Sequence, residues 1–162
     1  ASIDDASGIK DNPIYDIGLA VERIAAAVEA ARKLPFDFTL VARAENYIKG
    51  YTNLTDTLER LQRFEDVGAD VLFAPGVNDL ADIRTVCSSL SHPVNVVVGL
   101  AETPHSVADF TSAGVRRISL GSTLSRVAYG ALFRAAREIF DEGSFTAALS
   151  LAIPKNQLKR RE

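Results

Sequence analysis

The run Phe38-Thr-Leu-Val-Ala-Arg-Ala-Glu-Asn46 determines the fold class expected of this chain. Its apolar and β-branched residues predict a strand over 38–44. The run ends in a polar group, Arg43, Glu45 and Asn46, directly after the apolar part. A buried strand that ends in polar side chains is typical of the functional edge of a parallel sheet.

On both sides of this run the apolar residues recur at the spacing expected of a helix. Asp16, Thr55, Asp79 and Thr103 are expected to cap the first four helices, and Pro104 is expected at the first position of the fourth. Helices are predicted over 16–33, 55–67, 79–90, 103–114, 123–141 and 145–151, and further strands over 71–73, 93–98 and 115–120. The chain contains no Asn-Gly or Asp-Gly pair that would signal a hairpin. Strands separated by helices therefore predict an α/β fold with a parallel sheet.

The composition is that of a globular protein. The chain has 162 residues, 47% of them hydrophobic and 24% charged, which predicts one domain with a sizeable core. A net charge of −3 argues against nucleic acid or an anionic membrane as the partner. One cysteine excludes an internal disulfide, and no apolar run is long enough to span a bilayer. A cytoplasmic location is expected.

Arg43 and Glu45 are the first candidate site residues. They alternate to the same side of the strand, at its carboxyl end. A guanidinium there could grip a carboxylate or a phosphonate in a bidentate manner. The alternative is an Arg–Glu pair in which each side chain satisfies the other, and the pattern leaves both interpretations open.

Each of the other candidate site residues also has a simpler, non-functional interpretation. Asp4 and Asp5 could serve a divalent cation, directly or through its waters, or could be a solvated acidic pair. Gly121 and Ser122 could offer backbone N–H groups to an anion, or could simply begin a helix that Ser122 caps. His105 is expected in the first turn of a helix, as a surface residue.

Seven segments together resemble one known family, the isocitrate lyase/phosphoenolpyruvate mutase superfamily. The similarity is to its carboxyvinyl-carboxyphosphonate phosphorylmutase-like branch and extends from about Ile3 to Phe145. The segments are Ile3-Asp-Asp5, Pro13-Ile-Tyr-Asp16, Ala20-Val-Glu-Arg-Ile24, Phe38 to Asn46, Gly68-Ala-Asp-Val-Leu-Phe-Ala-Pro-Gly76, Pro93-Val-Asn-Val96 and Val115-Arg-Arg-Ile-Ser-Leu-Gly-Ser122.

The resemblance implies a (β/α)8 barrel, which needs about 250 residues. The chain would then cover about strands 4 or 5 to 8 and the C-terminal helices, without the N-terminal half that holds the direct metal ligands. Residues 1–162 would form part of one barrel domain, with 144–162 exchanged with a partner subunit in a homodimer or homotetramer. The segment from Ile9 to Asp16 would replace the family's gating loop, and it lacks the Lys-Lys-Cys-Gly-His motif of true isocitrate and methylisocitrate lyases.

The resemblance also implies a chemistry. Family members use Mg2+ to cleave or rearrange a C–C or P–C bond of a small 2-keto or 2-hydroxy acid, through a pyruvate enolate. Arg43 would hold the carboxylate or phosphoryl end of the substrate, with Glu45 as the catalytic acid beside it. Asn46, Gly121 and Ser122 would bind substrate. Asp4, where the family usually has Glu, would reach the metal through water.

Two other hypotheses stay open at this point. The chain could be a non-catalytic paralogue that acts as an interaction or scaffold module. It could also be a half-barrel dimer that binds a phosphorylated metabolite near Gly121.

Overall fold

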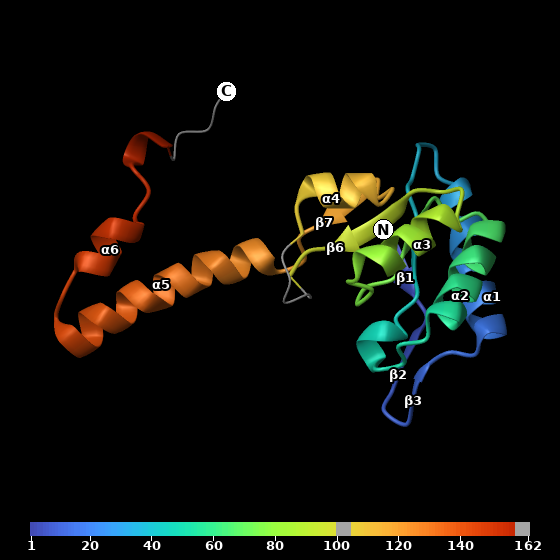
Figure 1. Cartoon of the computed structure of the whole chain (residues 1–162), viewed down its shortest axis with the longest axis horizontal. Coiled ribbons are helices and arrows are strands. Elements are labelled where there is room, and N and C mark those ends of the chain that lie inside the picture. The colour runs from blue at the N-terminus through green and yellow to red at the C-terminus, as the bar shows by residue number, and fades with distance from the viewer. Residues whose placement is uncertain (100–104, 158–162) are drawn as a thin grey trace. The chain divides into compact units, whose positions relative to one another are not determined.

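The computed structural model describes residues 1–99 and 105–157, and the chain divides into two units, 1–119 and 120–162. The first unit is built on a five-stranded parallel sheet in the order β1-β4-β5-β6-β7, of which β1, β6 and β7 are labelled in Figure 1. Its strands are β1 (Ser2–Asp4), β4 (Val41–Arg43), β5 (Val71–Phe73), β6 (Val94–Val97) and β7 (Arg117–Ser119). Neighbouring strands follow the order of the chain, as they do in a (β/α)8 barrel, so the predicted α/β fold is confirmed.

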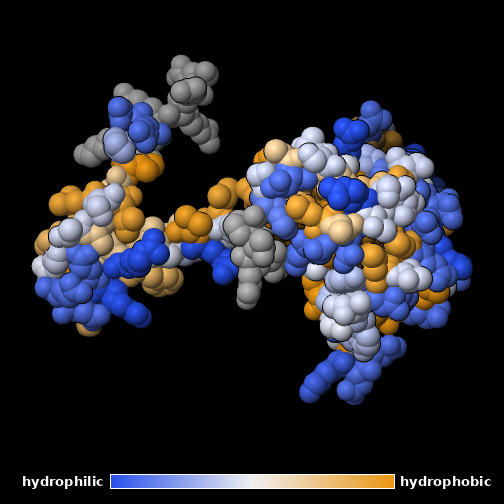
Figure 2. Space-filling view, viewed as in Figure 1, coloured by the Kyte–Doolittle hydropathy of each residue, from blue (hydrophilic) through white to orange (hydrophobic). Residues whose placement is uncertain are grey.

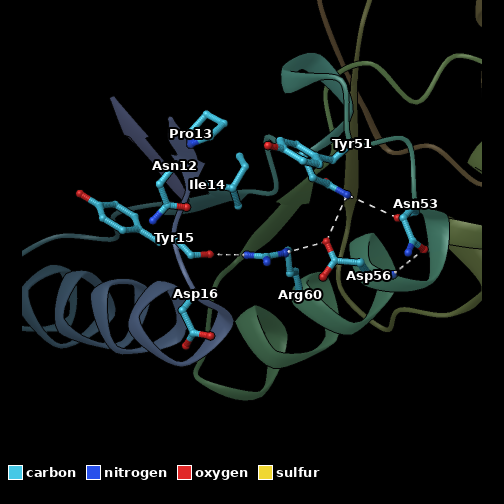
Figure 3. A pocket seen from close by; sticks show the side chains of 10 residues that line it. Asn12, Pro13, Ile14, Tyr15, Asp16, Tyr51, Asn53, Asp56 and Arg60 are labelled. Carbon is cyan, nitrogen blue, oxygen red and sulfur yellow. Dashed lines mark hydrogen bonds and ion pairs between the residues drawn. The ribbon is translucent and has the colours of Figure 1, made fainter. Parts of the chain in front are cut away.

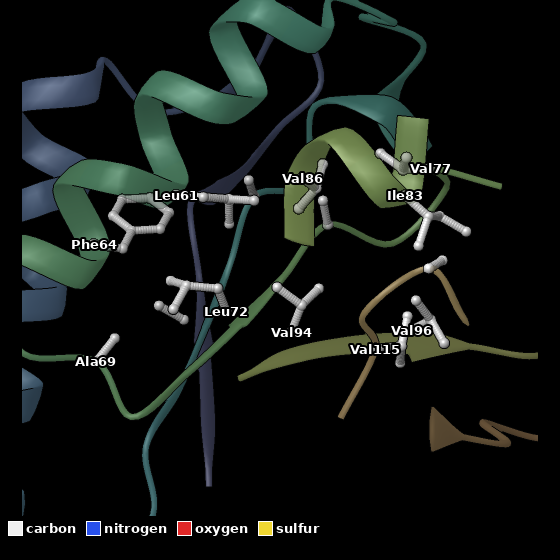
Figure 4. Close-up of a cluster of buried hydrophobic side chains, with 14 of the residues drawn as sticks. Leu61, Phe64, Ala69, Leu72, Val77, Ile83, Val86, Val94, Val96 and Val115 are labelled. Atoms are coloured by element: carbon white, nitrogen blue, oxygen red, sulfur yellow. The ribbon is translucent and has the colours of Figure 1, made fainter. Parts of the chain in front are cut away.

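Helices connect the strands and cover one face of the sheet. They are α1 (Ile17–Arg32), α2 (Leu54–Asp66), α3 (Leu80–Ser88) and α4 (Val107–Ser112), with a 3-10 turn η1 (Tyr47–Lys49) after β4. The core lies between helices and sheet, where Leu61 and Phe64 of α2 meet Leu72 of β5 (Figure 4). Strand residues that point to the opposite face of the sheet form a small separate cluster. It consists of Val41, Val71 and Phe73, with Val97 packed against it. The side of the strands opposite α1–α4 carries this second cluster.

The predicted strand over 38–44 is shorter in the structure. Leu40 donates its N–H to the Asp70 carboxylate (2.7 Å) and its carbonyl accepts from Asp70 and Val71. The Asp70 side chain thus takes the place of a ladder partner before β4 begins at Val41.

The expectation that the chain contains no hairpin is wrong. β2 (Ala6–Ile9) and β3 (Asn12–Ile14) pair antiparallel, with an irregular register between Ala6 and Ile9. Gly8 adopts a φ of 74°, which glycine accepts without a Cβ clash, and Ser7 Oγ donates to the Asn12 carbonyl. The hairpin thus lacks the expected turn pair and relies on a bulge glycine and a side-chain hydrogen bond.

Two of the four helices for which a capping residue was predicted begin elsewhere. Asp16 and Asp79 cap α1 and α3 as expected, but Asn53 rather than Thr55 caps α2, by accepting from the Asp56 N–H. Thr103 and Pro104 lie outside the described residues, and α4 begins after Ser106, which forms a capping box with Asp109. His105 therefore precedes the helix, and its Nε2 lies 3.0 Å from the Asn78 carbonyl.

The second unit consists of α5 (Thr123–Glu142), α6 (Thr146–Leu151) and a 3-10 turn η2 (Lys155–Gln157). α5 ends at Gly143, which adopts a left-handed φ of 65°. Ser122 is the N-cap residue of α5, but its side chain makes no capping hydrogen bond. Among the described residues no helix is both long and apolar enough to cross a membrane.

Gly76 fixes the loop after β5 against η1. Its φ is +96°, and an added Cβ would lie 2.9 Å from Tyr47 Cβ and 3.0 Å from Ile48 Cγ2. Gly50 has a similar φ of +89°, but a Cβ added there would meet nothing within 4 Å. We expect Gly50→Ala to cost about 1 kcal/mol of unfolding free energy, for the backbone alone. Gly76→Ala should cost about 2–4 kcal/mol, because the overpacking adds to that cost. Urea denaturation of both variants measures the difference, and equal losses would contradict the packing argument.

Candidate functional site

One row of residues runs across all five parallel strands, at the same register position on each. It consists of Asp4, Arg43, Phe73, Asn95 and Arg117. Residues in register on parallel strands project to the same face. The last four of them line a hollow of about 580 Å3 on the face that carries the small cluster. The candidate site is this concave face.

Arg43 is held in place from two sides. Its Nε donates to Glu45 Oε1 (2.9 Å), and its Nη2 donates to the same oxygen. Its guanidinium carbon lies 5.2 Å from the centre of the Phe73 ring, a cation–π arrangement. The side chain is still 28% exposed. Arg43 is therefore orientated by Glu45 and Phe73 and keeps donors available for an anion.

Both sequence interpretations of this pair find support here. Arg43 and Glu45 form an ion pair, as expected if each side chain only satisfies the other. Because one Glu45 oxygen takes both bonds, the guanidinium keeps the N–H groups of Nη1 and one of Nη2 for another partner.

Glu45 is a buried carboxyl group, with a side chain that is 6% exposed. Burial raises the pKa of Glu45 above its usual 4.5, the Arg43 charge opposes this, and Asp4 and Asp5 raise the pKa further. A buried carboxyl group with a raised pKa is suited to proton transfer.

The raised pKa of Glu45 predicts how stability changes with pH. The folded state binds the Glu45 proton more tightly than the unfolded state, so the unfolding free energy falls as pH rises from about 4.5 through the folded pKa. Glu45→Gln lacks this titration, and its stability relative to wild type should improve as pH rises through that window. Urea denaturation at a series of pH values measures this.

Asp70 is the control, because its pKa is shifted in the opposite direction to that of Glu45. Burial raises its pKa, but the Arg32 and Leu40 hydrogen bonds outweigh this and lower the pKa of Asp70 below 3.8. Asp70 therefore stabilises the chain above pH 3.8, and this contribution is lost as pH falls through its folded pKa. Asp70→Asn should lose stability relative to wild type as pH rises, and the same trend in Glu45→Gln would refute the assignment of Glu45.

The structure separates the two neighbouring aspartates. Asp4 is half-buried, and its Oδ1 accepts from the Ala6 N–H (3.2 Å). Asp5 is completely buried: Oδ1 accepts from the Glu45 N–H (2.8 Å), and Oδ2 pairs with Arg60 Nη1 (3.2 Å). Asp5 thus connects β1, the end of β4 and α2, and it is a structural residue, neither solvated nor open to a cation.

The metal prediction has limited support in the part of the chain that the structure describes. Within 1–99 and 105–157 no group of three or more His, Cys, Asp or Glu side chains could hold a metal ion. Asp4 is the one predicted metal contact, and a single carboxylate does not make a Mg2+ site. The described residues therefore do not fit a complete magnesium centre.

The structure does not bring Asn46 together with Arg43. Asn46 lines a different hollow, of about 490 Å3, between the β2–β3 hairpin and the start of α2 (Figure 3). Its Nδ2 donates to Thr57 Oγ1 (2.7 Å), so it anchors the loop after β4 to α2. Arg60 closes the same hollow, with bonds to the Tyr15 carbonyl (3.0 Å) and to Asp56 (2.9 Å).

Gly121 and Ser122 belong to the second unit. They precede α5, where the Ser122 carbonyl accepts from Arg126 N–H (2.9 Å) and from Ser125 Oγ (2.9 Å). These bonds are those of an ordinary helix start.

Sequence reasoning missed four residues of this region: Phe73, Asn95 and Arg117 on the concave face, and Arg60 beneath it. Arg60 carried a signal, because it lies on the apolar stripe of its helix with Thr57, Leu61 and Phe64. A charged residue on a buried stripe needs a buried partner. Phe73, Asn95 and Arg117 are recognisable only once the strand register is known.

Comparisons with known proteins point to one family. The family model of phosphoenolpyruvate phosphomutase matches residues 1–140. An uncharacterised protein of Mycobacterium tuberculosis is 31% identical over 143 residues, which cover 86% of this chain and 51% of that protein. A 2-methylisocitrate lyase of Aeropyrum pernix is 28% identical over 126 residues, or 76% of this chain and 39% of the enzyme. The chain thus spans about half the length of the curated relatives it matches, or less.

Solved structures agree with this. A Burkholderia cenocepacia protein assigned as a lyase or mutase superposes with a TM-score of 0.92 at 49% identity, over 96% of this chain and 56% of that one. A phosphonopyruvate hydrolase in complex with oxalate and Mg2+ superposes with a TM-score of 0.78 at 22% identity, over 97% of this chain and 56% of that one. The second likeness shows the fold alone.

Proposed function

The chain belongs to the phosphoenolpyruvate phosphomutase family, within the isocitrate lyase/phosphoenolpyruvate mutase superfamily, and from this premise we propose that the whole protein is a lyase or mutase. Its substrate would be a small 2-keto or 2-hydroxy acid such as an oxaloacetate- or phosphonopyruvate-like compound. The bond that is cleaved or rearranged would be the C–C or P–C bond next to the keto or hydroxy carbon.

The orientation of Arg43 is the observation that carries this proposal. The residue lies at the carboxyl end of β4, where active sites of parallel α/β folds collect. Glu45 and Phe73 hold its guanidinium, and the side chain remains partly exposed. Arg43 would bind the carboxylate or phosphonate of the departing or migrating group. Glu45, with its raised pKa, would keep a proton available beside it.

Magnesium is the ion that membership of this family implies. When bound in this family the ion supplies charge that stabilises the enolate of a keto acid. Among the described residues only Asp4 is proposed to contribute, through a metal-bound water. Direct ligands would have to come from elsewhere in the whole protein. Asn46, which lines the other hollow, and Gly121 and Ser122 are further proposed substrate contacts.

Oxalate, a planar mimic of the pyruvate enolate, tests the proposal. By isothermal titration calorimetry, we expect the whole protein to bind oxalate in the presence of Mg2+ and not in its absence. A coupled assay for pyruvate release from oxaloacetate or phosphonopyruvate then tests turnover. A folded whole protein that binds no oxalate with Mg2+ would overturn the lyase or mutase assignment.

The apolar surface of the second unit favours an additional, assembly role. α5 has no buried residue, and its exposed side chains include Leu132, Phe133 and Phe140, the last 90% exposed. Figure 2 shows hydrophobic surface along this unit. An apolar surface of this extent marks an interaction site. We therefore propose a homo-oligomer in which 144–162 exchanges between subunits, with 1–162 forming part of one barrel domain.

This assembly is tested by sedimentation velocity. Phe140→Asp should shift the chain towards the monomer, because it places a charge on the apolar face. Asp141→Asn on the same helix is the control and should leave the distribution unchanged. A wild-type chain that is monomeric at high concentration would contradict the proposal. An assembly that persists in a protein that fails the oxalate test would favour the non-catalytic scaffold.

A further inference from the structure

We propose that Arg117 binds a second acid group of the ligand, so that the concave face accepts a small organic acid with two separated acid groups. The proposal rests on the proposed function for the role of Arg43. It adds a binding residue on another strand, β7, for the second acid group that the oxaloacetate- and phosphonopyruvate-like substrates of the proposed function carry.

Arg117 faces the same hollow as Arg43. It pairs in register with Asn95, which follows Phe73 and Arg43 across the sheet, and all four line the hollow. Ser119, two residues further along β7, lines it as well. The described lining of the hollow contains two guanidinium groups and no carboxylate side chain. A hollow with this lining attracts anions.

The Arg117 guanidinium is available for a ligand. Arg32, Arg43, Arg60 and Arg63 each form an ion pair with an acidic side chain. Arg117 is exposed, and its side chain has no ion pair or hydrogen bond with any described residue. An unpaired guanidinium at the wall of an anion-attracting hollow is suited to bind a carboxylate or phosphonate with two parallel N–H donors.

The surface beside Arg117 is polar and well fixed. Asn95 is 2% exposed, and its Nδ2 donates to Ser119 Oγ (3.1 Å), which in turn donates to the Val96 carbonyl (3.1 Å). These bonds join β6 and β7 at the level of Arg117. The Asn95 Oδ1 atom is buried and has no hydrogen-bond partner among the described residues. A buried polar atom without a partner is unusual and marks a site rather than a simple packing core.

The spacing of the two arginines indicates two acid groups rather than one. Arg43 and Arg117 lie on strands that are three neighbours apart, or about 14 Å between backbones at the usual strand spacing. Both side chains line the hollow, and two acid groups held apart in one molecule can each meet one guanidinium across that span. A molecule with acid groups on separate carbons could bind both.

A series of acids tests this on the 162-residue chain by NMR titration. Butyrate has one carboxylate, and succinate, glutarate and adipate carry a second one at increasing distance. We expect at least one diacid to bind about tenfold more tightly than butyrate, as a charge-assisted hydrogen bond allows. Arg117→Met should reduce this diacid to the affinity of butyrate.

Arg116→Met is the matched control. Arg116 is the adjacent residue, is also exposed, and does not line the hollow. Its replacement should change diacid affinity by less than about twofold, the scale of a screened surface charge. Equal losses in both variants would mean that only net charge matters and would overturn the subsite.

The outcomes separate this inference from the proposed function. If Arg43→Met weakens binding and Arg117→Met does not, the subsite is overturned and the role of Arg43 stands. If Arg117→Met weakens binding and Arg43→Met does not, the subsite stands and the role of Arg43 is overturned. If no diacid binds more tightly than butyrate, the subsite is overturned whatever the oxalate result.

Discussion

Arg60→Met is expected to lower the free energy of unfolding by about 3–5 kcal/mol, the cost of removing one partner from a buried ion pair. Arg60 is the only cation within hydrogen-bond reach of the Asp5 carboxylate in the described chain, and Asp5 is 0% exposed. Its guanidinium also bonds to Asp56 and to the Tyr15 carbonyl at the exit of the hairpin. The substitution therefore leaves a buried carboxylate unpaired and a part-buried carbonyl without its donor.

Urea denaturation near pH 7 measures this loss, and the same helix supplies the control. Arg63 pairs with Glu59 four residues earlier, the same spacing as between Arg60 and Asp56. Both side chains of the Arg63–Glu59 pair are more than half exposed. Arg63→Met should cost less than about 0.5 kcal/mol. The double variant Asp5→Asn/Arg60→Met should recover part of the loss, because no charge is then left buried. If Arg60→Met and Arg63→Met lose the same amount, Asp5 does not depend on Arg60.

The fold was predictable because its signals are local. The alternation of strands and helices, the stops at Gly68 and Gly143, and the caps Asp16 and Asp79 each depend on a few neighbouring residues. Strand ends were less predictable. The Asp70 carboxylate takes the N–H of Leu40, 30 residues away, and this contact shortens β4.

The site was predictable only in part. The position of Arg43 and Glu45 at a strand end follows from their alternation, and the structure places them side by side. The grouping of Asp4 with Asp5 failed, because Asp4 ends β1 and is only half-buried, whereas Asp5 follows the strand, is fully buried and meets Arg60. Asn46 failed for a related reason, since it follows the strand and turns towards α2. Phe73, Asn95 and Arg117 could not be selected without the register, which is set by contacts between distant segments.

Arg43→Met should affect binding and stability together. Loss of the guanidinium removes the anion's charge-assisted hydrogen bonds, and we expect the affinity for the best diacid of the series to fall about 10- to 100-fold. The same change leaves Glu45 buried without its cation, which should cost about 1–3 kcal/mol of unfolding free energy. Lys33→Met, which breaks the exposed Lys33–Glu29 pair, is the control and should change neither quantity measurably.

The double variant Arg43→Met/Glu45→Gln separates the two effects. A neutral amide at position 45 no longer requires a cation, so most of the lost stability should return, as happens when both partners of a buried pair are replaced. Affinity for the diacid should remain low, because no guanidinium is restored. NMR titration and urea denaturation of the same samples measure both. If affinity returned together with stability, the weak binding of Arg43→Met would be a consequence of damaged folding, and Arg43 would be a structural partner of Glu45 rather than the residue that binds substrate.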